Sequence, residues 1–454
     1  MIMLKKTSVN LLDGPILRSI IAFAIPILIS NIFQQLYNTA DIMIVGRYLG
    51  PNALAGVGAT AAIFELVIGF ALGVGNGMGV VIARCFGAQD MMQLKRAVAS
   101  TLVIGLALSF LVSTIGHFGM YPLLEFLGTP AEIIDLSYQY IHMIVLCVGV
   151  TFAYNLCAGL LRAVGDSQAA LYFLIFSAIV NIILDLFFIT QLHLGVQSAG
   201  LATIISQGLS AILCYFYIRK RANFLLPQRK HFIWDKELYL DLLGQGLAMG
   251  LMTSIVSIGT VTLQTSINAL GATIISAQTS ARRIMSFSML PVSAIASSLT
   301  TFTSQNLGAN RPQRIQRGIY LGSMVAIVWT IFVAITLFFA SPSLNELISG
   351  STDSELISNA SLYNRISSSF YPVLAVLLVL RNSLQGLGQK ITPLISSFIE
   401  LFGKILFVIF IIPSTGYIGV IFCEPLIWVP MTIQLYYSYK HQPIIQSLKN
   451  ASHS

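Results

Sequence analysis

Two aspartates stand inside long apolar segments that otherwise carry no charge. Asp41 ends an uncharged stretch that begins after Arg18, and Asp185 ends another that begins after Asp166. A carboxylate at the centre of a bilayer costs about 2.5–3.5 kcal/mol on insertion scales, so an acid there is by default a candidate functional residue. Two acids that meet inside a membrane disfavour each other's ionisation, which suits them to take up and release a proton or a small cation.

The composition supports a membrane location for these segments. The 454 residues are 56% hydrophobic and only 9% charged, whereas an average soluble chain carries about 25% charged residues. The net charge of +8 comes from basic residues beside apolar runs, which indicates contact with lipid headgroups and no binding of nucleic acid. The five cysteines form no CxxC pair and are expected to pack as small apolar side chains.

Uncharged runs recur along the whole chain, and each is long enough for a helix of the roughly 20 residues that cross a bilayer. The first run lacks a cleavage site and is interpreted as a retained helix. Helices are the structure that such segments form in lipid, so the sequence predicts an all-α polytopic membrane protein with twelve transmembrane helices. They are expected to begin near residues 17, 53, 97, 132, 168, 197, 238, 273, 316, 354, 391 and 417.

The distribution of Lys and Arg predicts the orientation. Twelve crossings place both termini on one side, and basic residues favour the cytoplasmic side. With both termini in the cytoplasm, the inner loops and tails collect most of the 25 basic residues, Arg381 among them, and the outer loops hold only Arg47. The remaining four fall within predicted helices: Arg282, Arg283, Arg365 and Lys404.

The sequence also contains an internal repeat, because glycine-containing motifs recur at an offset of 221 to 223 residues. The matched positions are Gly50 with Gly271, Gly87 with Gly308, and Leu161–Gly165 with Leu384–Gly388. The sequence therefore predicts two pseudo-symmetric six-helix lobes, as in many secondary transporters. We expect an N-lobe over 1–221, a charged cytoplasmic linker over 222–236 and a C-lobe over 237–454.

Several motifs together resemble the multidrug and toxic compound extrusion (MATE) family over the full length of the chain. They are Pro26 in the first helix, NTADIMIVGRYLG around Asp41, GLLRAVGDSQ after the fourth helix, RNSLQGLGQK after the tenth, SQNLGA at 304–309 and EPLIW at 424–428. The acidic pair resembles the prokaryotic branch named for DNA-damage-inducible homologues. The resemblance implies a transporter and no enzyme, and the chain shows no nucleotide loop, HExxH motif or nucleophile triad.

The resemblance implies a proton or cation site in the N-lobe formed by Asp41, Asn181, Asp185 and Thr203. Asn181 and Asp185 are four residues apart and so share a helix face, and the predicted crossings place all four residues in the same half of the bilayer. Their carboxylate, amide and hydroxyl oxygens suit Na⁺ or a proton network, and the sequence leaves both ions open.

Weaker candidates lie around this site and in the C-lobe. The resemblance adds Tyr37 and Asn155 to the N-lobe network. Glu65 is a candidate lining residue, Pro26 a candidate hinge, and Glu400 either an intrahelical partner of Lys404 or a substrate residue. Arg282 and Arg283 either pair with Glu400 or face a cleft between the lobes. The C-lobe lacks the acids that the better-known branch carries in helices seven and ten, which favours coupling in the N-lobe.

The expected function is secondary antiport. Inward movement of H⁺ or Na⁺ would drive export of amphiphilic, often cationic, organic compounds from the cell by a monomer in the cell membrane, surrounded by lipid and without a cofactor. Two alternatives stay open: a flippase for lipid-linked precursors from the same superfamily, and a receptor or scaffold that binds ligands without transport.

Overall fold

The chain forms a helical membrane protein. The structure, a computed structural model, describes residues 9–126 and 128–447, and within these ranges there is no β-strand. Ten of the described helices are long and apolar enough to cross a membrane, or twelve spans when each of two bent helix pairs counts as one. The prediction of an all-α polytopic membrane protein is confirmed, and the helices begin within six residues of the predicted positions.

The described residues form two compact units, and two long helices contribute to both. The first unit contains residues 9–10 and 25–254, and the second contains 11–24 and 255–447. The shared helices are α1 (Ile16–Leu49) and α8 (Lys236–Asn268). The other helices of the first unit are α2 (Pro51–Gly87), α3 (Met91–Phe126), α4 (Ile134–Leu146), α5 (Val148–Ala163), α6 (Ser167–Thr190) and α7 (Gln197–Arg221).

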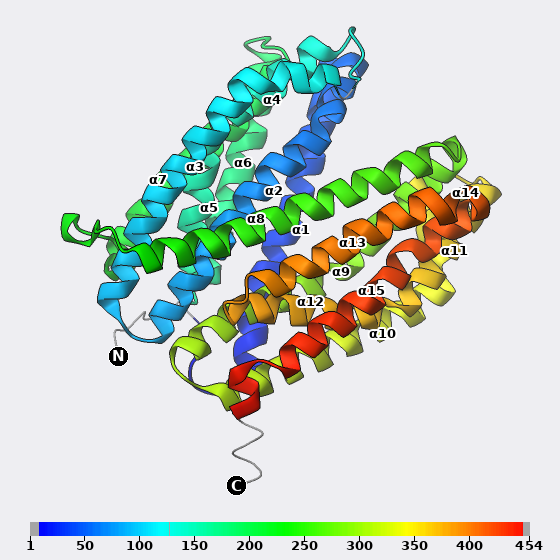
Figure 1. Ribbon diagram of the computed structural model, residues 1–454. Coiled ribbons are helices and arrows are strands. Elements are labelled where there is room, and N and C mark those ends of the chain that lie inside the picture. The colour runs from blue at the N-terminus through cyan, green and yellow to red at the C-terminus, as the bar shows by residue number, and fades with distance from the viewer. Residues whose placement is uncertain (1–8, 127, 448–454) are drawn as a thin grey trace. The chain divides into compact units, whose positions relative to one another are not determined.

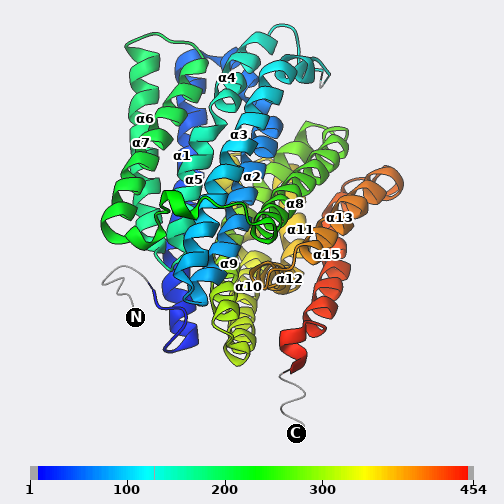
Figure 2. The ribbon, with the colours of Figure 1, turned by 60° about the vertical axis from the view of Figure 1, so that its left-hand side comes forward.

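Within the first unit, α6 and α7 lie side by side, and α7 also packs on α5 (Figures 1 and 2). The predicted linker after α7 carries two short 3₁₀ turns, η1 (Asn223–Leu225) and η2 (Arg229–His231), which pack against α3. Arg84 of α2 and Asp241 of α8 form an ion pair. The linker and this ion pair tie the first turns of α8 to the first unit.

The second unit repeats this order of elements. It contains α9 (Ala272–Gly308), α10 (Pro312–Ser349), α11 (Ser354–Ser369), α12 (Tyr371–Gly386), α13 (Ile391–Leu406), the π-helical turn η3 (Phe407–Ile411), α14 (Ile412–Thr415) and α15 (Tyr417–Lys440). Helix α9 packs on α10 and α12, and α15 packs on α12 and α13. Outward-facing side chains of α10, such as Phe339 and Leu347, are apolar and exposed, as a lipid-facing surface requires.

The fourth and tenth predicted helices are each broken in the structure, which the sequence pattern did not reveal. Helices α4 and α5 bend by 51° at Cys147, and α11 and α12 bend by 55° at Phe370. At the first break the Ser113 hydroxyl of α3 lies 3.1 Å from the Val145 carbonyl oxygen and 2.9 Å from that of Leu146. It therefore satisfies backbone acceptors that a continuous helix would have paired.

The second break has a different cause, because Pro372 stands at the start of α12. Proline lacks the N–H that would continue the α11 hydrogen-bond ladder, and it disfavours helical geometry in the residue before it. The bend in the second unit therefore follows from Pro372, and the bend in the first unit is stabilised by the Ser113 hydroxyl.

The backbone confirms that the sequence motifs mark a structural repeat. Residues with positive φ recur at separations of 221 to 223 residues. The pairs are Gly50 with Gly271, Gln89 with Asn310, Gly128 with Gly350, and Gly165 with Gly388. Each pair stands at a corresponding turn between helices, so the same chain reversals are built twice.

Small residues bring α2 and the first part of α8 unusually close. An added Cβ at Gly73 would lie 2.6 Å from the Met249 carbonyl oxygen, and one at Gly77 would lie 2.3 Å from that of Gln245. The facing positions on α8 are Gly246 and Gly250, so two GxxxG motifs meet. In lipid, where apolar burial gives no driving force, such close backbone packing stabilises helix pairs.

We therefore expect Gly77→Ala to destabilise the first unit. The new methyl group would collide with backbone that no side-chain rotation can move, and overpacking of this kind costs about 1–3 kcal/mol. Thermal unfolding of the purified protein in detergent should show a lowered midpoint. Gly75→Ala is the matched control, because a Cβ at Gly75 meets nothing within 4 Å. Equal midpoints for the two variants would contradict this account of the packing.

Candidate functional site

Helices α1, α6 and α7 bring the two predicted acids together in the first unit. Asp41 lies near the end of α1 and Asp185 near the end of α6. Their carboxyl groups lie against each other, close enough for a hydrogen bond when one of them carries a proton. Asp185 is fully buried and Asp41 is 8% exposed. Two carboxylates at this proximity repel each other when both are ionised. The pair therefore favours binding one proton or one cation between them.

The other two predicted residues complete the same cluster. Asn181 lies one turn before Asp185, and its amide nitrogen lies 3.2 Å from the Thr203 hydroxyl of α7. The Tyr37 hydroxyl, one turn before Asp41, lies 3.3 Å from the same Thr203 oxygen. Thr203 in turn donates to the Ala199 carbonyl oxygen. The structure thus brings together five of the predicted residues: Tyr37, Asp41, Asn181, Asp185 and Thr203.

Several oxygens of this cluster have no hydrogen-bond partner among the described residues. They are Oδ1 of Asp41, Oδ1 of Asn181 and both carboxylate oxygens of Asp185. A buried carboxylate without a donor or a cation is costly. The unpartnered atoms are all acceptors, so the cluster has the chemistry to hold a proton, or a hard cation such as Na⁺ among carboxylate and amide oxygens.

This donor set does not resemble a transition-metal site. Within the part of the chain that the structure describes, no three His, Cys, Asp or Glu side chains are placed to hold a metal ion together. A sixth participant, which the sequence analysis missed, is Tyr140 of α4, which is buried within electrostatic range of both acids and Tyr37. No spacing in the sequence pointed to Tyr140, because it reaches the site through the bent α4–α5 pair.

The weaker candidates of the first unit lie outside this cluster or at its border. The Asn155 amide donates to the Thr151 carbonyl oxygen of its own helix, and no contact joins it to the acids. Glu65 is exposed on α2. Pro26 lies inside α1, two residues after Ala24, at which the part of α1 belonging to the second unit ends.

A row of five alternating charges crosses the second unit. Arg282 of α9 pairs with Glu424 of α15 at 3.2 Å, and Glu424 pairs with Lys404 of α13 at 3.1 Å. Lys404 also pairs with Glu400, one turn earlier, at 3.0 Å, and Glu400 lies 3.6 Å from Arg381 of α12. We call these five residues the charged row. It links four helices, because charges buried in lipid must be paired.

The charged row shows which of the predicted contacts form and corrects one expectation. Glu400 does pair with Lys404, but Arg282 pairs with Glu424 and not with Glu400, while Arg283 is exposed. Arg381, which was expected in a cytoplasmic loop or tail, lies within α12 and is 7% exposed. Its Nε donates to the Ser396 hydroxyl at 3.0 Å. The charge count misplaced Arg381 because α12 continues five residues beyond it.

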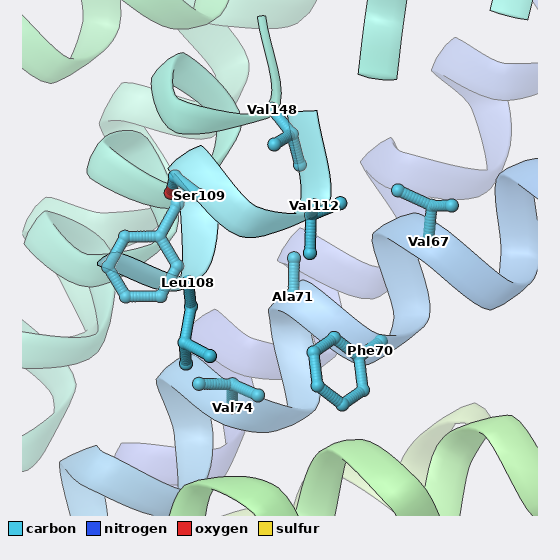
Figure 3. Close-up of a pocket in the computed structure, with 9 residues that line it drawn as sticks. Val67, Phe70, Ala71, Val74, Leu108, Ser109, Val112 and Val148 are labelled. Atoms are coloured by element: carbon cyan, nitrogen blue, oxygen red, sulfur yellow. The ribbon is translucent and has the colours of Figure 1, made fainter. Parts of the chain in front are cut away.

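Two cavities lie elsewhere, and neither contains the acidic pair or the charged row. One, of about 20 Å³, lies among α2, α3 and α5 and is lined by apolar side chains such as Phe70, Leu108 and Val148 (Figure 3). The other, of about 300 Å³, lies between α9 and α10 and is lined by residues such as Phe287 and Phe332. Both are lined mainly by apolar side chains, unlike the two buried polar clusters.

Comparison with known proteins agrees with this architecture. The MatE family model matches twice, over residues 26–187 and 248–410. "Probable multidrug resistance protein YoeA" of Bacillus subtilis (strain 168) is 29% identical over 314 residues, 67% of each chain. "FAD transporter" of Shewanella oneidensis (strain MR-1) is 27% identical over 398 residues, 85% of this chain and 86% of the relative. "DNA damage-inducible protein F" of Escherichia coli (strain K12) is 26% identical over 199 residues, 43% of each chain.

A solved structure shows the same fold over nearly the whole chain. "Crystal structure of MATE in complex with MaL6" matches with a TM-score of 0.87 at 23% identity, covering 98% of this chain and all of that one. The helical fold is that of a multi-pass membrane protein, and the family match and the names of the relatives place the chain among transporters and not among enzymes. The chain belongs to the MATE family, as its two matches to the family model show.

Proposed function

We propose that the chain is a cation-coupled antiporter that exports amphiphilic organic compounds, with H⁺ or Na⁺ as the coupling ion. The observation that carries this proposal is the buried contact between Asp41 and Asp185, whose unpartnered oxygens require a positive charge. The names of two relatives, a probable multidrug resistance protein and an FAD transporter, support organic and partly aromatic substrates.

Coupling follows from the charge state of the acidic pair. When the pair faces the outside, it takes up H⁺ or Na⁺ and its net negative charge falls by one. The less negative pair attracts a cationic substrate more weakly, so the substrate is released outside. After the pair faces the cytoplasm it loses the ion and recovers its charge. When the substrate is uncharged, the one elementary charge that the coupling ion carries across 100 mV supplies about 2.3 kcal/mol, which supports a concentration ratio on the order of tens. When the substrate is a monovalent cation, one-for-one exchange moves no net charge and the concentration gradient of the ion supplies the free energy.

Helix α1 connects the proposed ion site to the second unit and can transmit a change in the charge of Asp41. Its first turns belong to the second unit and its remainder, with Tyr37 and Asp41, belongs to the first. Pro26 stands just after this change and lacks the backbone N–H of an ordinary helical residue. We propose Pro26 as the hinge that lets α1 bend when Asp41 changes charge.

The remaining parts of the proposal concern how the protein sits in the cell. Both termini face the cytoplasm, because the basic residues concentrate in the loops and tails on that side. The transporter works as a monomer of two six-helix lobes, 1–221 and 237–454, joined by the linker 222–236, with lipid as its surroundings.

Dye efflux from vesicles with imposed gradients tests the function. Inverted vesicles that contain the protein should accumulate a fluorescent cationic dye when a pH gradient or a Na⁺ gradient is applied, and the gradient that works identifies the ion. Protein-free vesicles are the control. If neither gradient moves dye, the antiport proposal is wrong. Movement of a lipid-linked precursor would then favour a flippase, and dye binding without accumulation would favour a receptor.

A further inference from the structure

The charged row of the second unit carries one more positive charge than negative. Arg282, Lys404 and Arg381 contribute three cations, and Glu424 and Glu400 contribute two carboxylates. Within the described helices of this unit, no other Asp or Glu pairs with the row. A row that served only to tie helices together would be expected to balance, because an uncompensated buried charge is costly.

The surplus charge can be reached at one end of the row. The Lys404 side chain is 2% exposed and that of Arg381 is 9% exposed, whereas the Arg282 side chain is 31% exposed. Glu424 Oε1, the oxygen paired with Arg282, is shared with Lys404. Arg282 is therefore incompletely neutralised and is the cation of the row that an outside group can contact.

A second observation at this end of the row points to a ligand. Tyr371 is fully buried at the start of α12, and its hydroxyl has no hydrogen-bond partner among the described residues. It lies within electrostatic range of Arg282 and Glu424. A hydroxyl donor without a partner and a partly exposed guanidinium in the same region are both groups that bind a carboxylate or phosphate oxygen.

In the structural repeat, two residues of the charged row stand at positions equivalent to two residues of the acidic cluster. Asn181 is the fifteenth residue of α6, and Lys404 is the fourteenth of α13; Thr203 is the seventh of α7, and Glu424 is the eighth of α15. The pairs are in contact in both units, at 3.2 Å and 3.1 Å. The repeat thus carries two versions of one site: an acidic cluster whose unpartnered atoms are acceptors, and a net cationic row whose unpartnered atoms include Nη2 of Arg381 and Oε2 of Glu424.

We infer that the second unit holds an anion-binding site centred on Arg282 and Tyr371, which takes the carboxylate or phosphate group of an amphiphilic molecule. Arg282 supplies the charge and two geometrically fixed donors, Tyr371 supplies a further donor, and Lys404 maintains the surplus charge behind them. As a statement about substrates, the inference rests on the proposed export function and extends it to organic anions and zwitterions.

A matched pair of fluorescent ligands tests the site at equilibrium. Riboflavin and its 5′-phosphate share the same aromatic ring system and differ by the phosphate group. Their Kd values for the purified protein in phosphatidylcholine nanodiscs should differ at least about tenfold in favour of the phosphate. Equal Kd values, or binding of neither flavin, would overturn the inference. No gradient is involved, so failure here is distinct from failure of dye efflux.

Three variants separate a binding role from a structural one. Arg282→Gln leaves the pairs Glu424–Lys404 and Glu400–Arg381 complete, so it should fold and lose most of the preference for the phosphate. Lys404→Met leaves Arg282–Glu424 and Glu400–Arg381 complete, and it should weaken the same preference by removing the surplus charge. Arg283→Gln is the matched control, since Arg283 is the adjacent but exposed arginine. A preference unchanged in Arg282→Gln, or equally reduced in Arg283→Gln, would contradict the assignment.

A lipid headgroup offers the same phosphate chemistry, and a second set of nanodiscs distinguishes the source. If added phosphatidylglycerol weakens binding of the flavin phosphate in the wild type but not in Arg282→Gln, the site is an anionic-lipid site. If it leaves the wild-type Kd unchanged, the site selects soluble organic anions. Both results support an anion site at Arg282.

Discussion

Replacing Asp185 by asparagine should abolish gradient-driven efflux and leave the protein folded. The substitution keeps the size of the side chain but removes a group that can take up a proton or share a cation with Asp41. Because Asp185 is fully buried and both of its carboxylate oxygens lack partners, loss of its charge relieves an electrostatic cost. Efflux from vesicles should fall to the rate of protein-free vesicles, and the thermal unfolding midpoint should not decrease.

The same measurement on Asp41→Asn and on the double variant tests whether the acids act as one unit. Each single substitution should cause nearly the full loss, and the double variant should be no slower, because groups that act together are strongly non-additive. Asp135→Asn, which changes an exposed acid of α4, is the matched control and should pump normally. Wild-type rates in either Asp41→Asn or Asp185→Asn would remove the acidic pair from the coupling mechanism.

The acidic cluster was accessible to sequence reasoning because its constraints are local. Asp41 and Asp185 each stand alone in a long uncharged run, and Asn181 lies one helical turn from Asp185. Their depth follows from counting residues along helices that lipid forces to be regular. The twelve spans and the repeat could be predicted for the same reason, because the glycines at the turns separate one regular helix from the next.

The charged row was not accessible in this way, because its contacts depend on which helices become neighbours. Only the Glu400–Lys404 contact lies within one helix. Glu424 stands at the end of an uncharged run just as Asp41 does, and this signal should have singled it out. Arg381 gave no comparable signal: five residues before a glycine it is equally compatible with a loop, and only the packing of α12 on α13 and α15 shows that it is buried.

Removing different members of the charged row should have unequal consequences for stability. Glu424→Gln leaves Arg282 without a carboxylate and Lys404 with Glu400 alone, and it raises the surplus positive charge of a buried cluster. Removing one partner of a buried pair costs about 3–5 kcal/mol. Lys404→Met replaces the middle cation by an apolar side chain of similar length and leaves each carboxylate one cation, Arg282 for Glu424 and Arg381 for Glu400, so we expect a smaller loss.

Denaturation in mixed micelles with increasing sodium dodecyl sulfate measures both effects as free energies of unfolding. Glu424→Gln should lose several kcal/mol, and Lys404→Met should lose clearly less. In Glu424→Gln three cations share the single carboxylate of Glu400, whereas in the double variant only two cations remain for it, and the surplus charge lies on Arg282, whose side chain is 31% exposed and can be solvated by water. The double variant should therefore be more stable than Glu424→Gln alone. If Lys404→Met instead costs as much as Glu424→Gln, Lys404 is a structural partner, and the surplus charge assigned to the anion site does not exist as a separate feature.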